Sequence, residues 1–192
     1  MGKIRIAVIG ASGYTGADTL SISVDDLGNT GSGGNLVGTS ATAITVSSVN
    51  SSSPSLIASV TSATVNENAA SVVVDSAISV SDPDSNVKSA VVTLLSPGTT
   101  EALTFTNQGG ATGSYNSLTG VLSIGAASSG TTFSPSVMQS LLQSVRYSDP
   151  TNNNPLTSRT VTFQVTDTSN NLSNLVSRNI TINAINDAPV TT

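Results

Sequence analysis

The sequence predicts an all-β protein in which two antiparallel sheets pack face to face and one short helix closes a side. Of 192 residues, 34 are serine and 26 are threonine, about a third of the chain, whereas charged residues make up 9%. Short hydroxyl and β-branched side chains suit pleated strands and turns, and the charged helix formers are scarce. The apolar residues also recur in short runs of period two between turn residues.

The first 17 residues differ in kind from the rest. A hydrophobic run, Lys3–Ile9, leads into Gly-x-x-Gly-x-x-Gly at Gly10, Gly13 and Gly16. This segment resembles the dinucleotide-binding start of N-acetyl-gamma-glutamyl-phosphate reductase, which implies NADP at the glycine turn. After Gly16, however, the apolar residues alternate as in a strand, and the chain has neither the Cys nor the His of that family. We therefore expect residues 1–17 to be a head fragment, with a truncated NADP-binding reductase as the alternative.

An internal repeat organises the remainder. Thr19–Asn29 aligns with Thr160–Asn170 at an offset of 141 residues, and Ile44–Asn50 aligns with Ile180–Asn186 at an offset of 136. Repetition at this spacing is typical of modules in an array. The sequence thus predicts the last hairpin of a preceding repeat at residues 18–50, a linker at 51–55, and one complete sandwich module at 56–192.

Turn residues divide the complete module into short strands. The predicted strands are Leu56–Val65, Ser71–Val80, Lys88–Leu95, Ala102–Thr106, Gly120–Ile124, Ser144–Ser148, Ser158–Thr166 and Leu175–Ile185. A helical segment is predicted at Ser134–Gln143, with Ser134 as N-cap and Pro135 at the first helical position. Its apolar residues share one face, which would cover a side of the sandwich.

Composition excludes several classes of function. The chain contains no His and no Cys, so it has no Ser-His-Asp triad, no thiolate nucleophile, no disulfide and no structural zinc site of the usual ligands. Residues 18–192 carry four basic and eleven acidic side chains, a net charge of −7 that opposes nucleic-acid binding. No apolar run is long enough to span a membrane. A carbohydrate-binding sandwich is a further alternative, but the chain has no Trp, and Tyr147 lies in an apolar strand.

The acidic residues suggest a site for a hard cation. Asp82 and Asp84 flank a proline and can direct two carboxylates into one small volume. If Asp167 ends a strand at the same pole, its oxygen atoms join them. Like charges this close repel unless a cation lies between them, and Ca²⁺ accepts six to eight oxygen ligands in loose geometry.

Several motifs taken in order resemble the cadherin-like, immunoglobulin-like tandem repeats of bacterial surface and secreted adhesin-type proteins. The motifs are Val65-Asn-Glu67-Asn, Asp82-Pro-Asp84-Ser-Asn86, Val165-Thr-Asp167 and Asn186-Asp187-Ala-Pro189. The resemblance implies a cadherin-like β-sandwich outside the cell, with no enzymatic activity, that acts as a spacer or adhesive unit. Its partners would be neighbouring modules of a longer parent and a cell-surface ligand.

The resemblance also implies a set of calcium ligands. Asp82, Asp84 and Asp167 match the family's site between modules, and Asn50 matches the linker asparagine. Glu67 and Asp149, with Asn186 and Asp187, would form the opposite half-site. Ser51 stands where the second linker copy has Asp187, so the first junction lacks a linker carboxylate.

Each of these residues has a simpler interpretation. Asp82-Pro-Asp84 is a common β-turn, Asp167 alone would cap a hairpin, and Glu67 would be a solvated charge on an edge strand.

Overall fold

A computed structural model describes residues 15–25, 33–34, 36–47, 49–150 and 157–185, and it divides the chain into two compact units, residues 1–49 and 50–192. The glycines at positions 10 and 13 lie outside the described residues. Gly16 is the first residue of a strand and has a φ of 138°, a value that favours glycine. The strand predicted after Gly16 is therefore confirmed.

The first unit contains one antiparallel hairpin, made of β1 (Gly16–Asp25) and β2 (Val37–Val46). Its strand register repeats that of a second hairpin, β12 (Ser158–Asp167) with β13 (Val176–Asn183). Thr19 lies opposite Ala43, and the residues aligned with them, Thr160 and Asn179, also lie opposite each other. The alignment read from the sequence thus carries over to the pairing of the two hairpins.

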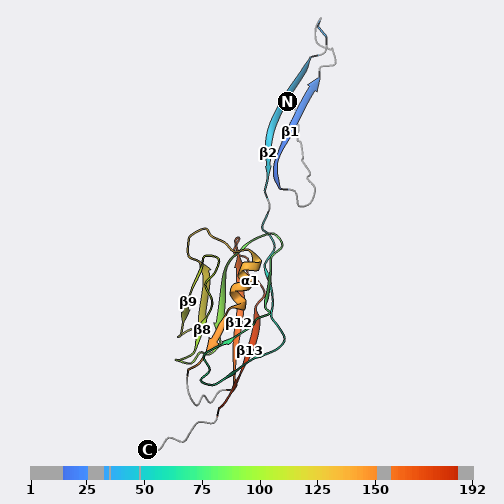
Figure 1. Cartoon of the computed structure of the whole chain (residues 1–192). Coiled ribbons are helices and arrows are strands. Elements are labelled where there is room, and N and C mark those ends of the chain that lie inside the picture. The colour runs from blue at the N-terminus through green and yellow to red at the C-terminus, as the bar shows by residue number, and fades with distance from the viewer. Residues whose placement is uncertain (1–14, 26–32, 35, 48, 151–156, 186–192) are drawn as a thin grey trace, which may run out of the picture. The chain divides into compact units, whose positions relative to one another are not determined.

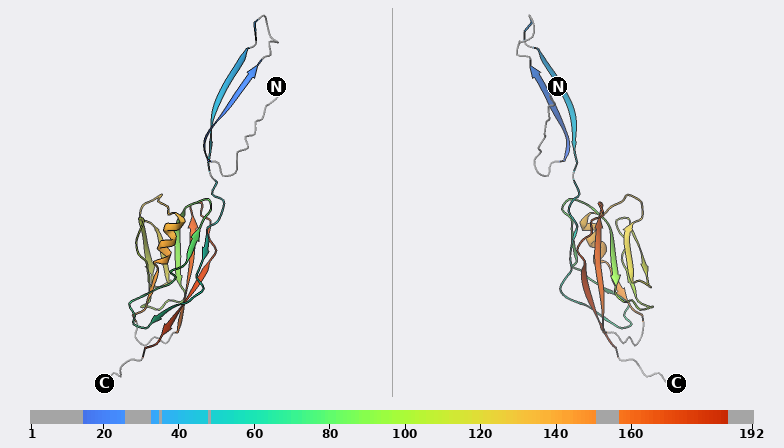
Figure 2. Two further views of the ribbon diagram at one scale, coloured as in Figure 1. Left: turned by 45° about the vertical axis from the view of Figure 1, so that its right-hand side comes forward. Right: turned by 180° about the vertical axis from the view of Figure 1, so that it is seen from behind.

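The second unit is a sandwich, shown in Figures 1 and 2. A six-stranded sheet has the order β4-β13-β12-β7-β10-β9, in which β4 and β13 are parallel and all other neighbours are antiparallel. Smaller antiparallel sheets, β5-β11-β8 and β3-β6, complete it. The further bounds are β3 (Ser55–Ile57), β4 (Ala63–Asn66), β5 (Val72–Val73), β6 (Ser79–Ser81), β7 (Val87–Leu94), β8 (Ala102–Thr104), β9 (Ala111–Asn116), β10 (Val121–Ala126) and β11 (Arg146–Ser148). The predicted all-β sandwich with a single short helix is confirmed.

The core follows the period of two. In β12, buried residues alternate with partly exposed ones from Arg159 to Asp167, and Val161, Phe163 and Val165 are completely buried. Buried residues of β7 and β13 lie in the same cluster. One face of the six-stranded sheet therefore forms the interior, and β12 presents a charged residue to it at each end.

The helix α1 (Pro135–Gln143) begins where the sequence predicts. Ser134 accepts a hydrogen bond from the Val137 amide, Pro135 stands in the first turn, and Met138, Leu141 and Leu142 are buried. Figure 1 shows α1 in front of the long strands, and the opposite view in Figure 2 shows β12 and β13 in front of it. No helix in the described part of the chain is long and apolar enough to cross a membrane.

Two predicted strands are wrong in extent. The segment from Leu56 to Val65 is two strands, because the chain passes from the β3-β6 sheet to β13, and the carbonyls of Ser59 and Thr61 bind Arg178 at the crossing. The segment from Ser71 to Val80 is also two strands, because Asp75 accepts the amide of Ala77 in a local turn.

A further strand was not predicted. Strand β9 follows two glycines with positive φ and is poor in apolar residues, so its alternation is weak.

Candidate calcium site

Three loops form the pole at which the second unit begins. Asn50 donates from its amide nitrogen to Ser85 Oγ (2.7 Å) and to Thr168 Oγ1 (3.0 Å), and those two hydroxyls lie 2.7 Å apart. The Asn171 side chain donates to the Ser52 carbonyl oxygen at 3.5 Å. Residues distant in sequence, near positions 50, 84 and 168, are thereby held together.

Asp84 binds the entering chain. Its Oδ2 accepts the backbone amides of Ser51 (3.1 Å) and Ser52 (3.0 Å). The hydrogen bond from Ser51 is the largest influence on this carboxyl group, and together with that from Ser52 it lowers the pKa below its ordinary value. Asp84 is therefore ionised in the folded state at neutral pH.

Asp82 shapes the turn that carries Asp84. Its Oδ1 accepts the amides of Asp84 (3.2 Å) and Ser85 (3.1 Å), as in an Asx-turn. Burial raises the pKa of Asp82, and the neighbouring Asp84 carboxylate adds to that effect against the opposing backbone hydrogen bonds. The two carboxylates therefore interact unfavourably.

Asp167 ends β12 and is fully buried. Its Oδ1 accepts the amides of Ser169 and Asn171, both at 2.8 Å, and its Oδ2 accepts the Asn171 side-chain amide at 2.8 Å. Burial acts to raise the pKa of Asp167, but hydrogen bonds from Asn171, Asn50 and Ser169 outweigh it and lower the pKa. Asp167 thus caps its own loop, and it also lies beside Asn50.

Three oxygen atoms at this pole are buried without a hydrogen-bond donor: Asn50 Oδ1, Asp82 Oδ2 and Asp84 Oδ1. No described lysine or arginine forms an ion pair with Asp82, Asp84 or Asp167. An unpaired buried acceptor is unfavourable, and more so when it is charged. A hard cation between these atoms would remove that cost.

The described residues contain no group of three or more His, Cys, Asp or Glu side chains arranged to hold a metal ion. The donor set at this pole differs from such a group because one of its three unpaired oxygens belongs to an asparagine. Backbone and water oxygens would complete the coordination that Ca²⁺ requires.

The opposite half-site is described only in part, because Asn186 and Asp187 lie outside the described residues. Glu67 is buried, with 4% of its surface exposed, and its Oε1 accepts the Ile185 amide at 2.5 Å. The expectation of a solvated edge charge at Glu67 is therefore wrong: its carboxylate binds the chain that leaves β13. Asp149 is buried as well and accepts a hydrogen bond from Thr100 Oγ1 at 3.2 Å.

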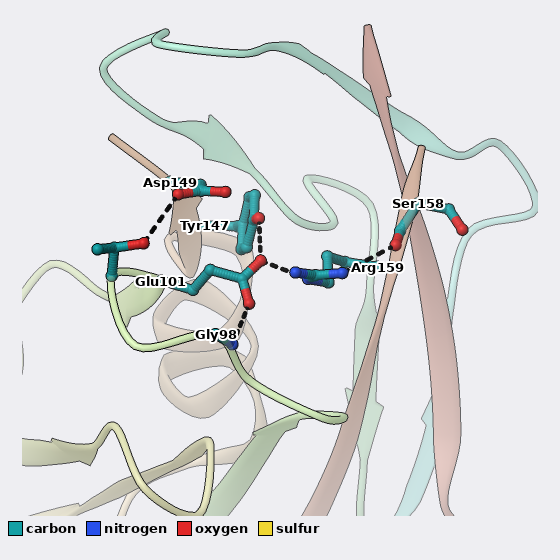
Figure 3. Close-up of polar contacts among 7 residues, drawn as sticks. Gly98, Glu101, Tyr147, Asp149, Ser158 and Arg159 are labelled. Carbon is teal, nitrogen blue, oxygen red and sulfur yellow. Dashed lines mark hydrogen bonds and ion pairs between the residues drawn. The ribbon is translucent and has the colours of Figure 1, made fainter. Parts of the chain in front are cut away.

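A buried ionic cluster, which we call the Glu101 cluster, was not predicted (Figure 3). Glu101 Oε1 accepts hydrogen bonds from the Tyr147 hydroxyl and Arg159 Nε, while Oε2 accepts the Gly98 amide. Burial raises the pKa of Tyr147 and acts to lower that of Arg159, but Glu101 outweighs burial and raises the pKa of Arg159. Tyr147 is completely buried, so it offers no face to a sugar.

The alternation of residues along β12 is a sequence signal that could have predicted this cluster. Arg159 shares its strand face with Val161 and Phe163, which places a guanidinium in the core and requires a buried anion nearby. Arg178 has the same relation to Ile180 and Ile182, and its Nε lies 3.0 Å from Asp75 Oδ2 without hydrogen-bond alignment.

Comparisons with known proteins identify no family. No protein-family model matches the sequence, and no curated protein matches it. Among solved structures, the crystal structure of the protocadherin gammaB4 extracellular domain is similar over 87% of this chain, with 16% sequence identity and a TM-score of 0.34. The similar region spans 22% of that chain. The assignment of the sandwich therefore rests on its own strand pairings.

Proposed function

We propose that the second unit is a non-enzymatic spacer or adhesion module of an extracellular protein, and that Ca²⁺ bound at the pole of Asn50, Asp82 and Asp84 stiffens the chain where it enters the sandwich. The proposal rests on one observation: each of these residues has a buried oxygen atom that accepts no hydrogen bond. Two belong to carboxylates without a described basic partner, which is the chemistry that a hard cation satisfies.

The position of the site supports a stiffening role. Asn50 and Ser51 belong to the segment that enters the unit, and Asp84 already binds the Ser51 amide. A cation shared by Asn50 and the two aspartates would tie this segment to the loop before β7. Bending of the chain at residue 50 would then require the loss of a metal ligand.

The internal repeat supports the role of a spacer. A chain that carries the terminal hairpin of one module before a complete one has the organisation of a tandem array. Calcium at millimolar concentration outside cells would occupy even a weak site, since extracellular modules bind it with dissociation constants of about 10⁻⁴–10⁻³ M.

Calorimetric titration of the chelator-treated full chain with CaCl₂ tests the metal. We expect saturable binding of one ion and a higher melting temperature in calcium, since a ligand at 100 times its dissociation constant stabilises by about 2.7 kcal/mol. Asp84→Asn and Asn50→Ala should weaken binding. Asp18→Asn is the matched control, because it removes an exposed carboxylate of the hairpin unit.

The same titration with Mg²⁺ in place of Ca²⁺ tests whether the coordination geometry of the site is irregular, because Mg²⁺ demands near-ideal octahedral geometry. If calcium produced neither heat nor a melting shift in the wild-type chain, the metal part of the proposal would be wrong.

A further inference from the structure

The side-chain amide of Asn50 is held through its nitrogen atom. Its Nδ2 donates to Ser85 Oγ at 2.7 Å and to Thr168 Oγ1 at 3.0 Å. Burial acts to raise the pKa of Asp167, and a hydrogen bond from Asn50 is among those that outweigh it. Three acceptors therefore surround the two hydrogen atoms of this amide, whereas its oxygen Oδ1 is buried and accepts no hydrogen bond.

The two hydroxyl groups determine which end of the amide faces them. Ser85 Oγ donates its one hydrogen atom to the Asn86 carbonyl oxygen at 2.9 Å. The Thr168 hydroxyl lies 2.7 Å from Ser85 Oγ, so Thr168 must be the donor in that contact. Neither hydroxyl has a hydrogen atom left for Asn50. An inverted amide would therefore place its oxygen against atoms that can only accept, so the network selects the observed orientation.

We call the three acceptors around Nδ2, on Ser85, Thr168 and Asp167, the orienting set. We propose that the orienting set positions Asn50 as a calcium ligand and does not itself bind the cation. The inference rests on the calcium site of the proposed function, and it gives Asp167 a role different from the ligand that the resemblance to tandem repeats implies. Outer groups that orient a metal ligand in this way typically contribute about 10–100-fold to metal affinity.

The hydrogen bonds of Asp167 support this division of roles. Its Oδ1 accepts two backbone amides and its Oδ2 accepts the Asn171 side-chain amide, each at 2.8 Å. By contrast, Asp82 Oδ2 and Asp84 Oδ1 are buried and accept no hydrogen bond. A cation gains most from oxygen atoms that no donor satisfies, because binding these atoms breaks no hydrogen bond of the protein. Asp167 is therefore an anchor for Asn50.

A matched pair of variants at position 168, which is exposed, tests the orienting set. Thr168→Val keeps the shape of the side chain but removes the hydroxyl, so we expect calcium affinity to fall about tenfold or more. Thr168→Ser keeps the hydroxyl and should change the affinity by less than about twofold. Calorimetric titration of the chelator-treated full chain with CaCl₂ measures both.

The orientation of the amide can be measured without calcium. In the calcium-free, ¹⁵N-labelled chain, both side-chain amide protons of Asn50 should exchange slowly with water, because both are hydrogen-bonded. NMR detects this exchange, and the absence of the signals in Asn50→Ala identifies them. Thr168→Val should accelerate the exchange, and Thr168→Ser should not. A merely structural role of the hydroxyl would not separate the two variants in this way.

Carboxyl-carbon NMR of the unmodified chain tests the role of Asp167 without a substitution that could disturb folding. Addition of calcium should shift the side-chain signals of Asp82 and Asp84 more than that of Asp167, because only the first two carboxylates would bind the cation.

Three results would overturn the inference and leave the proposed calcium site intact. They are equal calcium affinities of Thr168→Val and Thr168→Ser, fast exchange of the Asn50 amide protons in the calcium-free chain, and a calcium-induced shift of Asp167 as large as that of Asp84. Failure of the wild-type chain to bind calcium would instead overturn the proposed metal site, and the inference with it.

Discussion

The buried charges at the two ends of strand β12 have different surroundings. Arg159 and Asp167 lie on the same inward face and are 9% and 0% exposed. Arg159 meets the carboxylate of Glu101, so the charge at its end is compensated within the protein. Asp167 lies beside the loop of Asp82 and Asp84, where no described lysine or arginine forms an ion pair with these carboxylates.

The comparison teaches how to distinguish a structural charge from a ligand-binding one. Glu101 uses both oxygens on donors of the protein, whereas Asp82 and Asp84 each keep one buried oxygen without a donor. Burial and acidity alone do not separate the two ends. The two kinds of charge are distinguished by counting the hydrogen-bond donors at each carboxylate oxygen.

The largest expected effect concerns the end of β12 at which Glu101 compensates the charge of Arg159. Arg159→Met leaves Glu101 buried without its cation, and breaking a buried ion pair in this way costs about 3–5 kcal/mol of unfolding free energy. Urea denaturation measures it. The double variant Arg159→Met with Glu101→Gln should recover much of the loss, because no uncompensated charge remains. A loss below about 1 kcal/mol in the single variant would contradict the distinction.

At the acidic end, the effect of Asp82→Asn on the melting temperature should have opposite signs without and with calcium. In chelator it removes a charge that burial and Asp84 disfavour, so the melting temperature should rise. In calcium it removes a ligand, and a tenfold weaker affinity lowers the stabilisation by about 1.4 kcal/mol. Thermal scans of the wild-type chain and the variant, each in chelator and in calcium, measure this change of sign. The same sign in both buffers would contradict a cation at this pole.

Acid titration of the calcium-free chain separates the three aspartates. The folded-state pKa values of Asp84 and Asp167 are lowered, so their stabilisation is present above the ordinary value near 4 and is lost as the pH falls through the folded-state values. The raised pKa of Asp82 acts in the opposite sense, since it favours the folded state as the group protonates.

The test follows unfolding free energy by urea denaturation between about pH 5 and pH 2. Asp167→Asn should flatten the fall, and Asp82→Asn should steepen it. Parallel curves for both variants would contradict the assignment.

The smallest effect comes from Ser51→Asp. It places a carboxylate beside the pole, where an exposed unit charge near a divalent ion contributes about 1 kcal/mol, or about fivefold in calcium affinity. The same change should lower the melting temperature slightly in chelator, because it adds a like charge near Asp84. Ser51→Asn is the uncharged control, and calorimetry that gives equal affinities for the two variants would show that the bound cation does not lie beside position 51.

The alternation of apolar residues and the internal repeat of the sequence predict most of the fold. Alternation locates β7 and β12, the Ser-Pro signal locates α1, and the two offsets anticipate the register that both hairpins share. Turn chemistry predicts that Asp82 and Asp84 lie together, whereas Asn50 was expected at this pole only from the resemblance to tandem repeats, and Asp167 only if β12 ended there. The use of this pole as a metal site stays a prediction.

The rest depended on contacts distant in sequence. Glu101 lies in a loop without periodicity, so nothing local showed that it meets Arg159, 58 residues away. The interruption after Ile57 likewise arises where Arg178 binds the carbonyls of Ser59 and Thr61. Propensity does not report such long-range demands.

The parallel pairing of β4 with β13 has a mechanical consequence. The chain enters the second unit at Asn50, beside the loop after Asp167, and reaches Ile185 beyond the far end of β13, beside Glu67. When the two termini of this unit are pulled apart, β4 and β13 slide along each other, so their inter-strand bonds bear load together instead of opening one after another. The same topology that closes the core therefore gives the unit resistance to shear along a stretched polypeptide.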